Sequence, residues 1–234
     1  MDGDTEASDS GSEPIENVDL ATNSRVRLLG AIATLLSLGG IAVAILLDPT
    51  FSWTTDALSD LGVRDRSAPV FNWGLILGGL VGVGYAVELG RGALSESERR
   101  PGSGPGGAVR AVAALRAIVF ALSMIAMAGV GAFDLTHPLH GPAAIGFYGL
   151  VTVVFAVDGV ARRGTTTGRI AFGFVPVHVA VWATFVWGWW PVTGLALPEL
   201  PGALMLAAWV WAVGPVPVLT GETVPTRLGN GADR

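Results

Sequence analysis

Residues 28–47 read LLGAIATLLSLGGIAVAILL, a run of twenty residues without Asp, Glu, Arg or Lys. A helix needs about 20 mostly apolar residues to cross the roughly 30 Å hydrocarbon core of a bilayer, so this run predicts a membrane-spanning helix. The composition agrees, because 51% of the 234 residues are hydrophobic and only 14% are charged, with a mean hydropathy of +0.56. Such a chain is far more apolar than an ordinary soluble domain.

Five further apolar runs follow along the chain. The predicted spans cover about residues 26–47, 68–90, 111–133, 141–161, 170–190 and 200–221. Short connections, such as RRGTTTGR at 162–169, predict that consecutive helices are antiparallel neighbours. The expected fold class is therefore all-α, a polytopic membrane bundle with six transmembrane helices.

The charges outside the spans predict how the chain is oriented. Residues 1–24 are rich in acidic residues before the first arginine, which predicts a disordered acidic tail. Most arginines flank one face of the predicted bundle, and only Arg64 and Arg66 lie on the other. With an even number of spans, the positive-inside rule places both termini in the cytoplasm. We expect a transmembrane domain at 25–221, a cytoplasmic tail at 222–234, and a multi-pass location in the cell membrane.

Two compositional features narrow the setting and the chemistry. All fourteen basic residues are arginine, and the predicted soluble tail is strongly acidic. Dense surface carboxylates keep proteins soluble under strong ionic screening, so this pairing suggests a halophilic archaeon. The chain contains no cysteine, which excludes disulfides, thiolate metal sites and cysteine nucleophiles.

A set of polar residues is expected at the external ends of the spans, where an ionisable group beside hydrocarbon needs a partner or a purpose. The set comprises Asp56, Ser59, Asp60, Asn72, Asp134, His137 and His140. One interpretation is a binding pocket without metal. A second is a divalent-metal site, in which Asp134, His137 and His140 are joined by Asp56 or Asp60. The third is ordinary turn and capping chemistry beside Pro138 and Pro142. We expect no cofactor.

Other residues within the spans have structural interpretations. A stripe of small residues on the second span would allow close helix packing, and it consists of Gly74, Gly78, Gly82 and Ala86. An ion cluster near the cytoplasmic face would neutralise its members by pairing, and it consists of Glu88, Arg116 and Asp158. His178 follows Pro176 by two residues, so we expect it to bond a carbonyl that the proline leaves free. A proton-relay or lipid-contact role for His178 is the alternative, and its depth argues against a shared zinc site with His137 and His140.

Two stretches carry a family resemblance. DALSDLGVRDRSAPVFNWGLILGGL at 56–80 and FDLTHPLHGPAAIGF at 133–147 resemble the signature regions of a six-span prokaryotic family described as domain of unknown function 998. The matching positions are Ser59, Leu61, Gly62, Phe71, Asn72, Gly74, Leu75, His137 and His140. A weaker similarity, in the Ser-Asp-x-Gly loop, extends to the eukaryotic DRAM proteins and to relatives linked with lipid remodelling of GPI anchors. The resemblance implies a lipid-facing role.

Three functions are compatible with these features. The leading hypothesis is a lipid-interacting or membrane-organising bundle with an external polar pocket and membrane lipids as partners. The rival is an intramembrane lipid hydrolase or transferase, with catalytic residues drawn from Ser59, Asp134, His137 and His140. A small-solute transporter is the third, although it would need more charged groups near the bilayer midplane. Nucleic-acid binding is not expected, because the arginines flank the spans and form no patch.

Overall fold

The computed structural model describes residues 13–99 and 106–219, and the regular structure of this part is entirely helical. The long helices are α1 (Glu13–Leu47), α2 (Ala68–Arg99), α3 (Gly106–Ala132), α4 (His140–Ala161), α5 (Thr166–Val186) and α6 (Ala196–Ala208). A short 3-10 helix, η1 (Leu58–Gly62), precedes α2, and a π-helical turn, η2 (Trp209–Val213), continues α6. In the described part, six helical segments are long and apolar enough to cross a membrane, so the predicted six-span all-α fold is confirmed.

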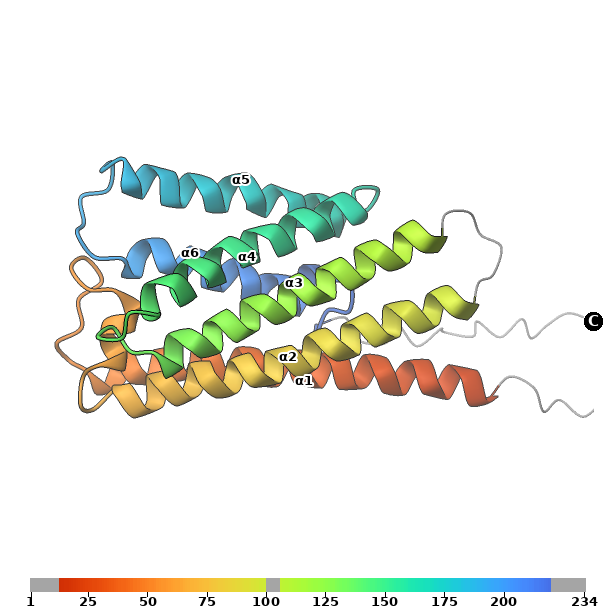
Figure 1. Cartoon of the computed structure of the whole chain (residues 1–234), viewed down its shortest axis with the longest axis horizontal. Helices are drawn as coiled ribbons and strands as arrows, with labels where there is room; N and C mark the ends of the chain where they lie inside the picture. Colours follow the sequence, from red (N-terminus) through yellow and green to blue (C-terminus); the bar gives the residue numbers. More distant parts are fainter. Residues whose placement is uncertain (1–12, 100–105, 220–234) are drawn as a thin grey trace, which may run out of the picture.

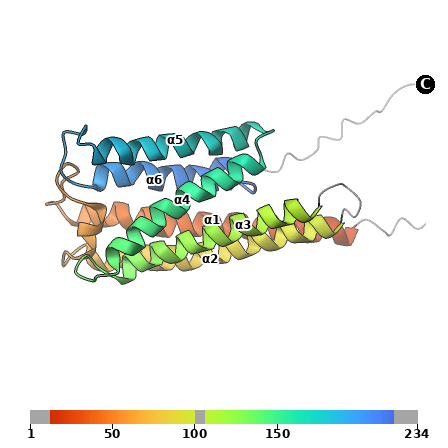
Figure 2. The same ribbon diagram turned by 45° about the horizontal axis from the view of Figure 1, so that its top comes forward.

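The helices lie side by side and run alternately up and down the bundle (Figures 1 and 2). The loops at 48–67, 133–139 and 187–195 gather at one end, which we name the loop end (Figure 1). The first residues of α1 lie at the opposite end, which we name the far end. The two stretches that carry the family resemblance therefore meet at the loop end, as the six-span topology requires.

The first helix begins earlier than the sequence suggested. Residues 13–24 continue α1, although their composition predicted disorder. A helix that already spans the membrane extends at little cost, because each added residue forms another backbone hydrogen bond without a new nucleus. The rest of the predicted tail, residues 1–12, and the tail at 222–234 lie outside the described residues.

The last two spans end earlier than predicted. Helix α5 stops at Val186 instead of residue 190, because Gly188 adopts a left-handed backbone with φ of 74° and Pro191 follows. The helical path of α6 begins at Ala196 and ends with η2, before Pro215. Gly214 leaves the helical conformation with ψ of 175°, and Pro215 and Pro217 follow it, so the span ends there instead of continuing as predicted.

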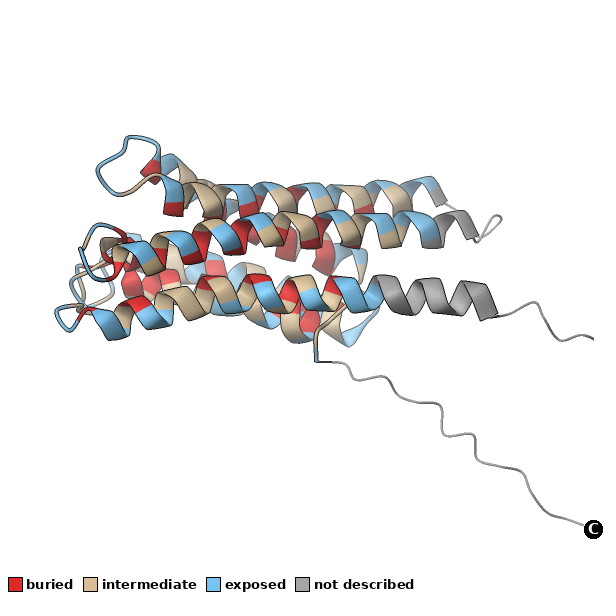
Figure 3. Cartoon of the chain, turned by 90° about the horizontal axis from the view of Figure 1, so that it is seen from below, coloured by how far each residue is buried: buried red, intermediate tan, exposed pale blue. Residues whose placement is uncertain are grey.

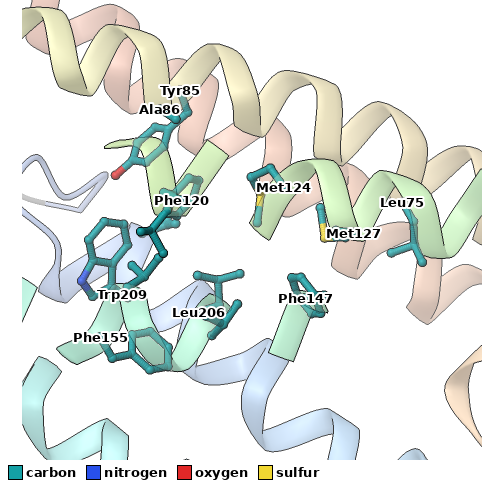
Figure 4. Packing of buried hydrophobic residues seen from close by; sticks show 14 of the residues in the cluster. Leu75, Tyr85, Ala86, Phe120, Met124, Met127, Phe147, Phe155, Leu206 and Trp209 are labelled. Carbon is teal, nitrogen blue, oxygen red and sulfur yellow. The ribbon is translucent and has the colours of Figure 1, made fainter. Parts of the chain in front are cut away.

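Exposed and buried residues alternate along the helices (Figure 3). The bundle is held by an apolar core in which aromatic rings from three segments meet. The ring centroid of Phe120 on α3 lies 5.1 Å from that of Tyr85 on α2 and 5.4 Å from that of Trp209 on η2 (Figure 4). The outward faces carry large apolar side chains that a bilayer would cover, and exposed Trp187 and Trp189 lie at the loop end as expected for interfacial anchors.

The small residues of α2 form packing contacts. A Cβ added at Gly74 would lie 2.9 Å from the carbonyl oxygen of Leu36, and one at Gly78 would lie 3.1 Å from that of Ala33. Both positions therefore face the backbone of α1. Gly82 instead faces Met124 of α3, and Ala86 is buried. The stripe thus brings α2 close to both of its neighbours, as glycine does in membrane helices.

A buried ion cluster joins α3, α4 and η2. Asp158 is fully buried and accepts hydrogen bonds from Arg116 (3.0 Å), from Arg162 and from the indole nitrogen of Trp209 (2.7 Å). Glu88, expected from the sequence to join this cluster, instead pairs with Arg91 one turn along α2. The third member of the cluster is Arg162, which the sequence analysis did not include. It follows Asp158 by four residues, so the two side chains lie on the same side of the chain.

His178 is buried between helices and bonds side chains. Its Nε2 accepts from the indole of Trp182 (3.2 Å), so its Nδ1 carries the proton and donates to the hydroxyl of Thr152 (2.8 Å). The hydroxyl of Thr152 in turn donates to the carbonyl of Tyr148 (2.9 Å). The carbonyl expected to be its partner is thus replaced by a threonine on α4, and both ring nitrogens are satisfied.

Candidate functional site

An elongated cavity lies inside the bundle. The cavity has a volume of about 80 Å³. Its lining residues come from α1, η1, α2, α3, α4, α6 and η2. On α1 the lining runs from Gly30 to Ile41, which corresponds to about 16 Å of helix at 1.5 Å per residue. The cavity therefore extends over about half of the roughly 30 Å hydrocarbon core of a bilayer.

Most of the cavity wall is apolar. Met124, Met127, Phe147 and Leu206 contribute to it from three helices (Figure 4). Two hydroxyl groups of α1 also reach the lining, but Ser37 bonds the carbonyl of Ala33 and Thr34 bonds that of Gly30, each at 2.9 Å. These hydroxyls are satisfied by their own helix. The middle of the cavity thus offers an apolar surface to a guest.

Three polar side chains line the loop end of the cavity. They are Ser59 of η1, His140 at the start of α4 and Glu199 in the first turn of α6, and each residue is only 7% exposed. They come from three segments that are far apart in the sequence. The fold therefore gathers a hydroxyl, an imidazole and a carboxylate at one end of an otherwise apolar cavity.

Glu199 joins the last span to the first external loop. Its Oε2 accepts a hydrogen bond of 2.7 Å from the backbone N–H of Leu58, at the start of η1. The backbone N–H of Ala196 donates to the carbonyl of Asp56 (2.9 Å), which fixes the same two segments a second time. Since Leu58 directly precedes Ser59, this bond anchors Glu199 to the segment that carries Ser59, and both residues line the cavity.

His140 is oriented by a backbone carbonyl. Its Nδ1 lies 2.7 Å from the carbonyl oxygen of Phe133, and because that oxygen can only accept, Nδ1 must carry the proton. Neutral His140 therefore presents the lone pair of Nε2, which has no hydrogen-bond partner within the described residues. A carbonyl that fixes the tautomer in this way is a common partner of functional histidines.

The loop above the cavity is held by ion pairs. Arg64 bonds Asp48 and Asp56, each at 2.8 Å. Hydrogen bonds from Thr50 and from Arg64 lower the pKa of Asp48 to about 2. A hydrogen bond from the backbone N–H of Ser52 and, to a smaller extent, one from Arg64 lower the pKa of Asp56. Both carboxylates thus stay charged at neutral pH and hold η1 over the cavity.

The remaining residues of the predicted external set do not line the cavity. Asp56 belongs to the ion pairs of the loop, and Asp60 accepts from the N–H of Ala57 (2.7 Å) at the start of η1. Asn72 donates to the carbonyl of Gly62 (3.0 Å), which secures the junction of η1 with α2. These three side chains build the loop that covers the cavity.

Asp134 and His137 form the turn before α4. Hydrogen bonds from the hydroxyl and the N–H of Thr136 lower the pKa of Asp134. His137 is exposed, accepts from the N–H of Leu139 (3.1 Å) and stacks on Phe133 at 4.7 Å. Of the two histidines in this turn, only His140 reaches the cavity.

Metal binding gains no support from this arrangement. Within residues 13–99 and 106–219, no group of three or more His, Cys, Asp or Glu side chains converges as metal ligands would. Asp134 and His137 are committed to their turn, so they do not approach His140 as a chelating set.

Sequence reasoning missed Glu199, the one carboxylate on the cavity wall. It directly precedes the uncharged run at 200–221 and was assigned to a loop, whereas the span begins at Ala196 and includes it. The available signal was a single acidic residue within one helical turn of a membrane span, flanked by Pro198 and Pro201.

Comparison with known proteins identifies the family. The model of the family described as protein of unknown function DUF998 matches residues 31–215, which is more than half of the chain. The matched region runs from α1 to just beyond η2 and includes every part of the cavity wall except Gly30. No curated protein and no solved structure matches the chain. The chain belongs to the DUF998 family of multi-pass membrane proteins of unknown function.

Proposed function

We propose that this protein binds one membrane lipid, with an apolar chain in the cavity and the polar end of the lipid at Ser59, His140 and Glu199. The observation that carries the proposal is the distribution of polarity along the cavity. Its middle is lined by apolar side chains and its loop end by three buried polar ones. Ligand sites are typically lined by apolar side chains with a few well-placed polar groups, and this cavity has that distribution.

The packing of the helices supports entry of the lipid from the side. Helix α1 approaches η1 at the loop end and the last span mainly at η2, toward the far end. Between these two places, α1 and α6 supply opposite walls of the cavity. We propose that a lipid chain passes between them from the bilayer. Helices in lipid are held together mainly by van der Waals packing, which an acyl chain can replace with similar contacts.

The arginine distribution supports an orientation with both termini in the cytoplasm and the loop end outside. The protein would then reside in the cell membrane and take its lipid from the outer leaflet. A cysteine introduced at the exposed Val63 in η1's flanking loop should react with an impermeant maleimide added to intact cells. Reaction only after the cells are opened would refute this orientation.

A cavity-filling variant tests lipid binding. Ala207 lines the cavity, whereas its neighbour Ala208 is exposed on α6 and does not. We expect native mass spectrometry of the purified wild-type protein and of Ala208→Phe to show one retained lipid, and Ala207→Phe to show none. Equal retention by the two variants would refute the proposal, provided that both keep wild-type helicity by circular dichroism.

A second function is favoured by one observation, the free Nε2 of His140 in the same cavity as the hydroxyl of Ser59. In an ester hydrolase, Nε2 would take the proton of the Ser59 hydroxyl as Oγ bonds to the acyl carbon. The ester C–O bond would break, the alcohol would leave with that proton, and water would release the acid. The side chains of Ser59 and His140 are not hydrogen-bonded to each other in the structure, so binding ranks first. Labelling of wild type but not Ser59→Ala by a lipophilic fluorophosphonate would favour hydrolysis.

A further inference from the structure

The polar end of the cavity is rich in hydrogen-bond acceptors, and its carboxyl group, Glu199, has no counter-ion among the described residues. Glu199 uses one carboxylate oxygen for the N–H of Leu58, and its other oxygen has no hydrogen-bond partner among the described residues. His140 lines the same cavity, and its Nε2 is an acceptor without a hydrogen-bond partner among the described residues. The hydroxyl of Ser59 makes no hydrogen bond within the described part of the chain, and Ser59 is 7% exposed.

Within residues 13–99 and 106–219, no cation pairs with Glu199. The titratable groups within electrostatic reach of Glu199 are Asp60, itself a carboxyl group, and the hydroxyl of Tyr148. Neither acid forms an ion pair within residues 13–99 and 106–219. Arg64, the arginine nearest to Asp60 in the sequence, is occupied by Asp48 and Asp56. A buried carboxyl group without a counter-ion ionises only at a cost in desolvation, and a ligand that supplies positive charge and donors would lower that cost.

We infer that the lipid held in this cavity has a headgroup with a primary ammonium, which pairs with Glu199 and donates to His140 Nε2 or Ser59. This inference rests on the proposed lipid binding and specifies its chemistry. An ammonium has three donors and one positive charge, which matches the acceptors at this end of the cavity. A phosphate or a free carboxylate would meet Glu199 and Asp60 with like charge, which disfavours binding.

Single-chain probes of equal chain length test the headgroup. The purified protein would be titrated with dodecylamine, dodecanoic acid, monododecyl phosphate and the glycerol ester of dodecanoic acid, with binding read by native mass spectrometry. We expect the amine to bind wild type roughly tenfold or more tightly than the acid or the phosphate, as one charge-assisted hydrogen bond would provide. The glycerol ester, which donates without charge, should fall between them.

Two variants separate the role of Glu199 from a general effect of surface charge. Glu199→Gln keeps an acceptor for the N–H of Leu58 but removes the charge, so we expect the amine and the glycerol ester to bind this variant alike. Asp134→Asn removes a carboxylate that does not line the cavity, and it should keep the preference of wild type. Tighter or equal binding of the phosphate or the acid by wild type would overturn the inference, as would an unchanged amine preference in Glu199→Gln.

The result also distinguishes the inference from the proposal on which it rests. If all four probes bind alike and Ala207→Phe abolishes their binding, the cavity binds lipid but the headgroup assignment is wrong. If no probe binds, or Ala207→Phe leaves binding unchanged, lipid binding in this cavity is itself refuted.

Discussion

Replacing Asp158 by asparagine tests the energetic account of the bundle most directly. The carboxylate is fully buried and accepts from Arg116, Arg162 and Trp209, which belong to α3, α4 and η2. Asparagine has nearly the same shape but no charge and only one acceptor oxygen. The variant therefore leaves Arg116, which is 7% exposed, without a counter-ion in the interior.

The expected loss of stability can be bounded from the structure. Removing one partner of a buried ion pair costs about 3–5 kcal/mol, because the other charge is left uncompensated. Arg162 has a side chain that is 19% exposed, so it can regain some solvation. We therefore expect a loss near the lower limit, about 3 kcal/mol.

Unfolding of the purified protein in mixed micelles, driven by increasing SDS and followed by circular dichroism, would measure this change. Glu88→Gln is the matched control, because its partner Arg91 has a side chain that is 71% exposed. That surface pair should contribute no more than about 0.5 kcal/mol. A loss below about 1 kcal/mol for Asp158→Asn, or one equal to that of the control, would refute the account of the cluster.

Three further predictions use the same unfolding assay. Trp209→Phe removes the indole donor to Asp158 but keeps an aromatic ring, so it should cost about 1.5–3 kcal/mol, and no loss would show that the hydrogen bond is dispensable. Gly74→Ala places a Cβ 2.9 Å from a backbone oxygen of α1 and should cost about 1–3 kcal/mol. Gly39→Ala meets nothing within 4 Å and should be neutral or stabilising, so equal losses would refute the packing argument. Because the folded-state pKa of Asp48 is about 2 against an ordinary 3.8, its stabilisation is present above 3.8 and is lost as pH falls through 2. Asp48→Asn should remove that part of the acid dependence, and an unchanged acid limb would contradict this assignment.

The sequence was sufficient for the architecture because the bilayer imposes strong length and polarity constraints. Runs such as 28–47 and 68–87 have few alternatives to spanning helices once about 20 residues lack charge. The errors lie at helix ends, where those constraints no longer apply. Helix α1 begins at Glu13 in a region of acidic composition, and α5 ends at Val186, two residues before the left-handed Gly188.

The site was less predictable because a cavity depends on how helices pack, which periodicity does not determine. Ser59 and His140 were selected as polar residues near span ends, and both line the cavity. Asp134 and His137 share that property, yet their side chains complete a tight turn. Which of two histidines three residues apart faces inward depends on where α4 begins, and α4 begins at His140.

The loop end and the floor of the cavity differ in polarity, and this difference would orient a bound amphiphile. Acceptors and the carboxyl group of Glu199 lie at the loop end, whereas Tyr85 and Phe120, which pack against Trp209, line the floor at the other end. Beneath those rings the cluster of Asp158 with Arg116 and Arg162 carries a surplus of one positive charge, since two arginines meet one carboxylate. An ammonium would therefore be attracted to the loop end and repelled from the floor. A bound single-chain amine would place its ammonium at the loop end and its chain toward the floor. Together with the proposed orientation, this polarity selects lipids whose headgroups lie in the outer leaflet.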